Sequence, residues 1–283
     1  MALRREPTAR QARLATELRR LREAAGLAAR EAAALLGVSP VQISHIESAL
    51  AGVSEERLRR LAANYSCSDG ELIEALTTMA TVRVQGWWED YRGILPAAYL
   101  DLAELDHHAT FRRDVAVMHV PGLFQTEDYA RALFTYMNPE FPDAEVEHRV
   151  QHRMRRKVIV EGSDPVPYET LIHEAALRIK VAGRASTRAQ LARILEMSEA
   201  EHVTVRVIPF ALDDFAGAGS AMVHVGGPLS RLDTVVRDAP HGTVFLDSEA
   251  QLAHFRRLFR RVRDQSLSAE ASRDLIHDLA KEL

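Results

Sequence analysis

The sequence predicts an α+β fold class, in which an all-α domain of five helices precedes a mixed α+β domain with a mainly antiparallel sheet. Apolar residues recur at helical spacing through residues 1–80. Short segments rich in β-branched residues, bounded by Gly, Pro or Asp, fill the last third of the chain. With 283 residues, the chain is long enough to build two separate cores. We therefore expect domains at residues 1–80 and 86–283.

The first domain is organised around the stretch from Gly26 to Leu50. Two short helical patterns, Ala29–Leu36 and Pro40–Leu50, flank a tight turn at Gly37-Val38-Ser39. This arrangement is the sequence form of a helix-turn-helix, in which the second helix enters a DNA groove. The stretch therefore predicts a DNA-binding element.

The start of the second helix of this motif is strongly marked. Ser39 is a natural N-cap, Pro40 suits the first helical position, and Gln42 completes a capping box. Ile43 and Ile46 face inward, which leaves a polar face that can reach base edges. The residues expected to read bases are Gln42, Ser44, His45 and Ser48. Phosphate contacts are expected from Arg22, Arg30 and Ser39.

Three further helices complete the predicted domain. Residues 10–25 carry leucines at spacings of four and three and end at Gly26. Ser54 caps a fourth helix, with Glu55 and Glu56 in its first turn, where the helix dipole favours acids. A capping box formed by Ser68 and Glu71 opens the fifth.

Residues 10–80, and the string GVSPVQISHIE above all, resemble the XRE-type (lambda-repressor-like) regulators. The resemblance implies a five-helix domain that binds double-stranded DNA. This chain departs from the pattern at Ala28 and Ala29, where a polar cap and a Gln are usual. It departs again at His45, where Arg or Lys is common, and after Glu47, where Gly usually follows closely. Each change removes a phosphate contact or a helix stop.

The amino-acid composition limits the cellular location and the classes of binding partner that we expect. Residues 1–66 hold eleven Arg against seven Glu, whereas the whole chain has a net charge of −4, so a basic head precedes an acidic body. The sequence lacks an apolar run of about eighteen residues and an amino-terminal secretory signal. Its single cysteine, Cys67, excludes an internal disulfide. These features predict a cytoplasmic, nucleoid-associated protein with no membrane contact.

The second domain opens with adjacent tryptophans, Trp87 and Trp88. Helices are expected up to about His108, from Thr126 to Phe134, and from Asp143 to Val160, with a strand at Val115–Val120. A capping box of Thr187 and Gln190 marks another helix, and two amphipathic helices, Glu249–Gln265 and Ser268–Glu282, end the chain. The remaining strands are expected at Val166–Ile172, Val203–Pro209, Ser220–Val225, Leu232–Val236 and Thr243–Leu246. The last four follow each other closely enough to be antiparallel neighbours.

The candidates for chemistry in this domain are weak. His148 and His152 lie four residues apart on one helix, but neither a carboxylate nor a third His accompanies them at ligand spacing. His173 and Glu174 at a strand end have no positioned nucleophile beside them. The FAGAG segment lacks the spacing of a phosphate-binding loop. We therefore expect no catalytic residue, no metal and no cofactor.

A second resemblance covers about residues 86–283. The phrases GWWEDYRGILPAAYLDLAELDHHAT and VPGLFQTEDYARALF, with IPF before FAGAG, are similar to the carboxy-terminal domain of a large actinobacterial family of antitoxin-like transcriptional regulators. The resemblance implies a regulatory domain that binds a small, separately encoded partner protein or a ligand. A pocket for it is expected near Trp87, Trp88, His173 and Phe215.

The sequence therefore predicts a sequence-specific transcriptional regulator that is not an enzyme and that binds DNA as a homodimer, because two-fold operators suit one short recognition helix. Two alternatives stay open. The chain could be an enzyme or toxin-like effector whose DNA-binding head only targets or autoregulates it. It could also be a protein-interaction module that has lost DNA binding, consistent with Ala28, Ala29 and His45.

Overall fold

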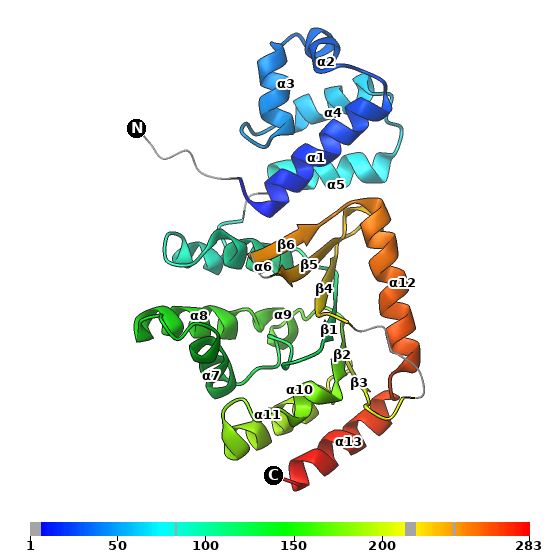
Figure 1. Ribbon diagram of the computed structural model, residues 1–283. Helices are drawn as coiled ribbons and strands as arrows, with labels where there is room; N and C mark the ends of the chain where they lie inside the picture. The colour runs from blue at the N-terminus through cyan, green and yellow to red at the C-terminus, as the bar shows by residue number, and fades with distance from the viewer. Residues whose placement is uncertain (1–6, 83, 213–218, 240–241) are drawn as a thin grey trace. The chain divides into compact units, whose positions relative to one another are not determined.

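The computed structural model describes residues 7–82, 84–212, 219–239 and 242–283, and its elements are drawn in Figure 1. The chain forms two compact units. The first, here called the helical unit, consists of Met1–Asp90 and Ala97–Leu105. The second, here called the sheet unit, consists of Tyr91–Pro96 and Asp106–Leu283.

The five expected helices of the helical unit are present. Thr8, Ser39, Ser54 and Asp69 cap four of them with side-chain oxygens. The prediction of Ser68 as the last cap was wrong by one residue, because Asp69 Oδ1 accepts from Leu72 N at 3.0 Å. The helices are α1 (Ala9–Ala24), α2 (Ala29–Leu36), α3 (Pro40–Glu47), α4 (Glu55–Asn64) and α5 (Gly70–Thr81), followed by the short 3-10 helix η1 (Trp87–Tyr91).

The core of the helical unit is built from one apolar stripe of each helix. Ala32 and Ala33 of α2 are fully buried, and such small side chains let α2 approach α3 and α4 closely. The larger core residues are Leu18, Leu36, Ile43, Ile46, Leu58, Leu61, Leu72 and Leu76. The amphipathic spacing read from the sequence is therefore the spacing that is buried.

Helix α6 (Ala97–His107) contributes to both units. Its first nine residues belong to the helical unit and its last two to the sheet unit. Asp101 Oδ1 accepts a hydrogen bond from Ala9 N at 3.1 Å. That backbone N–H lies in the first turn of α1, where no intrahelical acceptor exists.

The sheet unit contains one six-stranded mixed sheet in the order β3-β2-β1-β4-β5-β6. Strand β1 pairs with β2, and β2 with β3, in parallel, whereas the β1–β4, β4–β5 and β5–β6 pairs are antiparallel. The prediction of a mainly antiparallel sheet was wrong because helical crossovers join β1 to β2 and β2 to β3. The strands are β1 (Phe111–Ala116), β2 (Tyr168–His173), β3 (Val203–Ile208), β4 (Met222–Gly226), β5 (Thr234–Ala239) and β6 (Gly242–Leu246).

Helices cover both faces of this sheet (Figure 1). One core packs Tyr168 and Ile172 of β2 against the crossover helices and the last helix. The other packs Leu171 of β2 against Phe255 and Phe259 of a long amphipathic helix. The helices are α7 (Glu127–Met137), α8 (Asp143–Arg155), α9 (Val158–Glu161), α10 (Glu174–Arg178), α11 (Gly183–Met197), α12 (Glu249–Gln265) and α13 (Ala269–Lys281).

Strand β1 begins four residues earlier than predicted, because its charged residues are neutralised inside the unit. Arg112 donates from Nε and Nη2 to both carboxylate oxygens of Asp114, at 3.0 and 3.2 Å, and from Nη1 to Asp106. Arg156 donates to Asp106 from two nitrogens, at 2.9 and 2.6 Å, and the Tyr168 hydroxyl donates to Asp114 at 2.9 Å. Burial opposes the charge on Arg112, but the two aspartates outweigh it and raise the pKa of its guanidinium.

The predicted capping box of Thr187 and Gln190 is absent, because α11 starts at Gly183 and both residues lie within it. The buried amide of Gln190 instead accepts from Thr126 N and donates to the carbonyl of Phe124, both at 2.8 Å. Gln190 therefore fixes the start of α7, whose predicted cap, Thr126, is confirmed.

Candidate nucleic-acid interface

The turn between α2 and α3 has the geometry that its sequence predicts. Gly37 ends α2 in the left-handed region with φ 75°, where a side chain would be strained. The Ser39 hydroxyl accepts from Gln42 N at 3.3 Å, and Gln42 Oε1 accepts from Ser39 N at 3.1 Å. This reciprocal capping box fixes where α3 begins.

Helix α3 has one buried and one exposed face. Ile43 and Ile46 are 1% and 3% exposed and anchor it to the unit. The opposite face presents Val41, Ser44, His45 and Ser48, at the i, i+3, i+4, i+7 spacing of one helical stripe. Val41, Ser44 and Ser48 of this stripe are exposed, and His45 is half-buried. Val41, which sequence reasoning missed, is 59% exposed at the start of that stripe. Its place four residues before His45 was the signal that could have found it.

Two of the expected base-reading side chains are already engaged. Gln42 lies about 100° around the helix from Val41, and its amide oxygen is held by Ser39 N. The amide nitrogen is the part of Gln42 that can still donate to a base. The Ser48 hydroxyl donates to the carbonyl of Ser44 at 2.7 Å, which leaves its oxygen as an acceptor.

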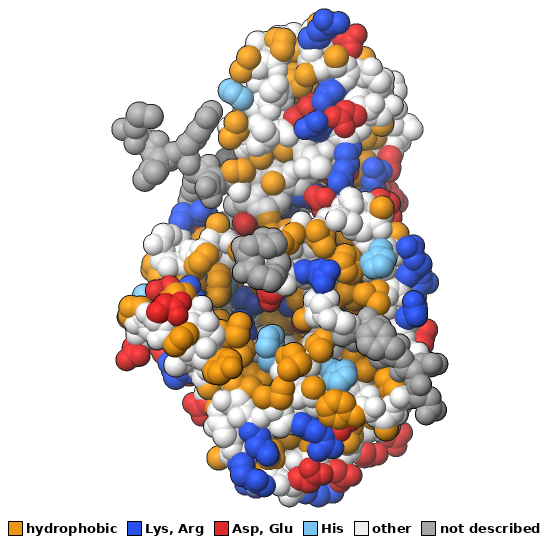
Figure 2. All heavy atoms as spheres, in the orientation of Figure 1, with side chains coloured by type: hydrophobic (Ala, Val, Ile, Leu, Met, Phe, Trp, Pro, Cys, Tyr) orange, Lys and Arg blue, Asp and Glu red, His pale blue; other side chains and the backbone are white. Residues whose placement is uncertain are grey.

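The exposed side of α3 is nearly uncharged. Helix α3 contains no Arg or Lys, and the side chains visible over it in Figure 2 are hydrophobic, neutral or histidine, whereas red and blue ones gather over α1. Arg30 at the start of α2 and Ser39 are exposed. They are the predicted phosphate contacts that the structure leaves at the surface.

The prediction that Arg22 contacts a phosphate was wrong, because its guanidinium is used inside the unit. Nε and Nη2 donate to the two carboxylate oxygens of Glu47 at 2.6 and 2.8 Å, and Nη1 donates to the carbonyl of Leu27 at 2.6 Å. Arg22 is 8% exposed. It joins α1 to the end of α3, a role that depends on a residue 25 positions away.

Two of the departures from the XRE-type pattern, at Ala28 and after Glu47, have local explanations. Ala28 offers no side-chain cap to α2, and the Glu31 carboxylate instead accepts from Ala28 N at 2.6 Å. Helix α3 ends through Ala49, which takes the left-handed conformation with φ 57° that usually requires Gly. The N–H groups of Leu50 and Ala51 then bond to the carbonyl of His45 at 2.8 and 3.0 Å.

Comparison with known families agrees with the division of the chain. A helix-turn-helix domain family matches residues 13–76, which contain α2, α3 and α4. A second family, described as a domain of unknown function (DUF5753), matches residues 99–278. The chain belongs to the DUF5753 family. No curated protein and no solved structure matches the chain. The first match indicates a DNA-binding regulator, and the second assigns no role to any residue.

The described residues expected to share a pocket belong to two different units. Trp87 and Trp88 belong to the helical unit and meet edge to face with ring centroids 6.1 Å apart. His173 belongs to the sheet unit, where its Nδ1 accepts from Ala175 N at 3.1 Å and caps α10. Phe215 lies outside the described residues. Glu174 bonds to Arg178 and to Phe210 N, so both members of the His173-Glu174 pair hold the backbone.

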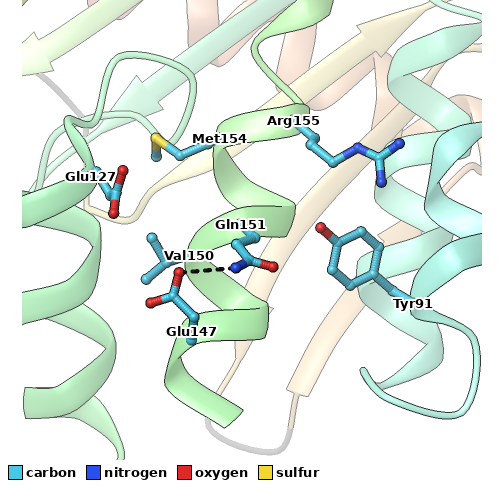
Figure 3. A pocket seen from close by; sticks show the side chains of 7 residues that line it. All are labelled: Tyr91, Glu127, Glu147, Val150, Gln151, Met154 and Arg155. Carbon is cyan, nitrogen blue, oxygen red and sulfur yellow. Dashed lines mark hydrogen bonds between the residues drawn. The ribbon is translucent and has the colours of Figure 1, made fainter. Parts of the chain in front are cut away.

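A groove of about 490 Å³ runs along α8 in the sheet unit (Figure 3). Glu147 and Gln151 lie on its α8 wall and share a hydrogen bond of 3.1 Å, while Arg131 bonds to Glu127 and Glu147 and offsets one of their two negative charges. The lining residues are Tyr91, Glu127, Glu147, Val150, Gln151, Met154 and Arg155. The groove can hold a polar molecule, and of the predicted pocket residues that the structure describes, Trp87, Trp88 and His173 do not line it.

Metal and membrane binding find no support in the described ranges. Within residues 7–82, 84–212, 219–239 and 242–283, no three His, Cys, Asp or Glu side chains are grouped as metal ligands. His152 of the spaced pair is 1% exposed and packs edge to face on Tyr91 at 5.1 Å. None of the helices in these ranges combines the length and hydropathy needed to cross a bilayer.

Proposed function

We propose that the chain is a sequence-specific transcriptional regulator of the XRE type that lays α3 in the major groove of duplex DNA. The observation that carries this proposal is the exposed stripe Val41, Ser44, His45 and Ser48, backed by buried Ile43 and Ile46. Short side chains on a rigidly anchored helix can approach base edges closely.

Contacts to the phosphates would come from the surroundings of this helix. Arg30 is exposed in the first turn of α2, and the Ser39 hydroxyl keeps its hydrogen for a phosphate while its oxygen accepts from Gln42 N. The paired Arg22 is not part of the proposal. Since few cations lie near α3, affinity would come from two copies binding two half-sites, and we propose a homodimer.

The DUF5753 domain is proposed as the regulatory part, without catalytic activity. The chain would then act in an antitoxin-like way, with a small separately encoded partner protein or a ligand acting on this domain. The groove along α8 supports a ligand, because it is an open volume of about 490 Å³ with polar and aromatic side chains in its lining. In the cell such a protein would be cytoplasmic and nucleoid-associated.

A binding measurement on matched serine variants tests the proposal. The full chain would be titrated into labelled duplexes selected from a randomised pool, with the region upstream of its own gene as a second probe. Ser44→Asp places a negative charge on the exposed stripe and should weaken binding at least tenfold. Ser68→Asp, exposed before α5, should leave binding unchanged. Equal effects of the two changes, or no duplex selected by the wild type, would contradict the proposal.

A further inference from the structure

The residue at the start of the exposed stripe of α3 is apolar. Val41 is 59% exposed in the first turn, directly after Pro40 and on the same stripe as Ser44 and His45. We propose that Val41 contacts the 5-methyl group of a thymine and so selects an A·T pair at one position of each half-site. This inference rests on the proposed function, because it names the base that the same helix reads.

The chemistry of the major groove restricts what Val41 can face. The thymine methyl is an apolar group presented there, whereas the other base edges present donors and acceptors that lose water when a hydrocarbon covers them. Val41 therefore gains contact area against thymine and leaves polar atoms unsatisfied against guanine, adenine or cytosine. The same side chain favours one base and penalises the others.

Most of the other side chains of α3 are poorly suited to select a G·C pair. No Arg or Lys of α3 can bond guanine with two donors. Its one acid, Glu47, is bound by Arg22 and cannot accept from the amino group of cytosine. Gln42 keeps a donor but not its acceptor, because Oε1 is held by Ser39 N. Val41 is the apolar member of a stripe whose other residues, Ser44, His45 and Ser48, are polar, and is thus the residue suited to cover a thymine methyl group.

Val41 is also held rigidly enough to discriminate between bases. Its backbone lies between Pro40, whose φ is fixed, and the capping box that closes on Gln42. A β-branched side chain has few rotamers to lose on binding. Little conformational entropy therefore offsets the contact.

The experiment combines a protein change with the loss of one DNA methyl group. Duplexes would first be selected from a randomised pool by the full wild-type chain and by Val41→Ala. The best site would then be made with deoxyuridine in place of each thymidine in turn, which removes the methyl group and keeps the pairing. Val82→Ala is the matched control, because Val82 is a 44% exposed valine at the end of α5.

We expect the effects of Val41→Ala and of the thymine-to-uracil replacement on binding affinity to be coupled. Uracil at one thymine position of a half-site should weaken wild-type binding about fourfold, the value of one buried methyl group. Val41→Ala should weaken binding to the thymine site by a similar factor and lose the difference between thymine and uracil. The Val82→Ala variant should keep the wild-type difference.

Three outcomes would overturn the inference. Wild-type binding that is unaffected by uracil at every position removes the methyl contact. A Val41→Ala variant that keeps the full thymine–uracil difference assigns that contact to another residue. Both results leave a sequence-specific DNA-binding protein intact, whereas failure of the wild type to select any duplex removes the proposed function as well.

Discussion

Arg22 and Glu47 form a bidentate ion pair between α1 and α3, with Nε–Oε1 and Nη2–Oε2 distances of 2.6 and 2.8 Å. The two side chains are 10% and 9% exposed. The third hydrogen bond of Arg22, to the carbonyl of Leu27, closes the loop that leads into α2. The pair therefore sets the position of the exposed stripe of α3 relative to the other helices.

Replacing Glu47 with Gln should lower the free energy of unfolding of the helical unit by about 3 kcal/mol, because it removes the bidentate counter-charge of the buried Arg22 guanidinium and leaves only the exposed Glu23 carboxylate, 3.6 Å away. Urea denaturation followed by circular dichroism measures the change. Glu55→Gln removes an exposed i,i+4 partner of Arg59, does not touch Arg22, and is the control. Equal stability of the two variants would mean that the buried pair contributes no more than a surface one.

Replacing Ala49 with Gly should raise the free energy of unfolding by about 1 kcal/mol, because Ala49 has φ 57° and a Cβ atom is strained in that region. Thermal denaturation of the full chain measures the gain. Ala34→Gly, at an exposed position inside α2, should lose about 1 kcal/mol. A loss at both positions would show that Ala49 is not strained.

Replacing Arg112 with Met should destabilise the sheet unit by more than about 3 kcal/mol, because Asp106 and Asp114 would keep buried charges with too few partners. Arg113→Gln, the neighbouring change at a half-buried arginine whose ion pair with Glu169 spans 3.5 Å, should cost less than about 1 kcal/mol. Denaturant unfolding of both variants measures the two changes in the free energy of unfolding. If Arg112→Met is as stable as wild type, the network is dispensable.

The sheet unit should lose stability on mild acidification through His119. Burial and then the charge of Arg153 lower the pKa of this imidazole below 6.5, against a weaker opposite effect of Asp238. The folded protein therefore binds the proton less readily than the unfolded chain. The free energy of unfolding is then level above about pH 7 and falls as the pH drops through 6.5 towards the lower folded-state pKa.

Measuring unfolding at closely spaced pH values between about 7.5 and 5.5 tests this slope. His119→Gln should reduce the slope, because its amide does not titrate. An identical slope in the variant would assign the pH dependence to another group.

Local signals in the sequence predicted the helical unit well. The capping box of Ser39 and Gln42 and the cap of α4 at Ser54 involve atoms three residues apart, and both are present. The predicted bounds of α2 agree with the structure, whereas α3 ends at Glu47 and not at Leu50. The Ala49 turn explains that difference, because an L-residue with positive φ cannot be expected from propensity.

The sheet unit depended more on contacts between distant residues. In the sequence, charged residues such as Arg112 and Asp114 are typical of a loop. In the structure, Asp106 and Arg156 neutralise their charges, so both can lie in a buried strand. The order of the strands was also predicted wrongly. The strands from Val203 onward were expected to be successive neighbours, whereas β4 pairs with β1, which lies more than 100 residues earlier in the chain. Pairing of this kind is set by tertiary packing, which short-range patterns do not record.

The candidate site was predicted in part for the same reason. Ser44, His45 and Ser48 followed from helical periodicity, and all three lie on the exposed stripe. Arg22 was misjudged because its partner Glu47 is remote in sequence. Val41 was missed because an apolar residue next to a cap is usually assigned to the core, although its place four residues before His45 puts it on the exposed stripe, where it is 59% exposed.

The hydrogen bond from Ala9 N to Asp101 determines which truncated fragments of this protein keep an intact helical unit. A fragment that stops at residue 80 lacks the acceptor at the start of α1, and one that starts at residue 99 divides α6. An amino-terminal fragment that extends to His107 retains the whole helical unit and keeps α6 undivided. Binding assays with shorter fragments would therefore measure damage at the cut as well as affinity for DNA.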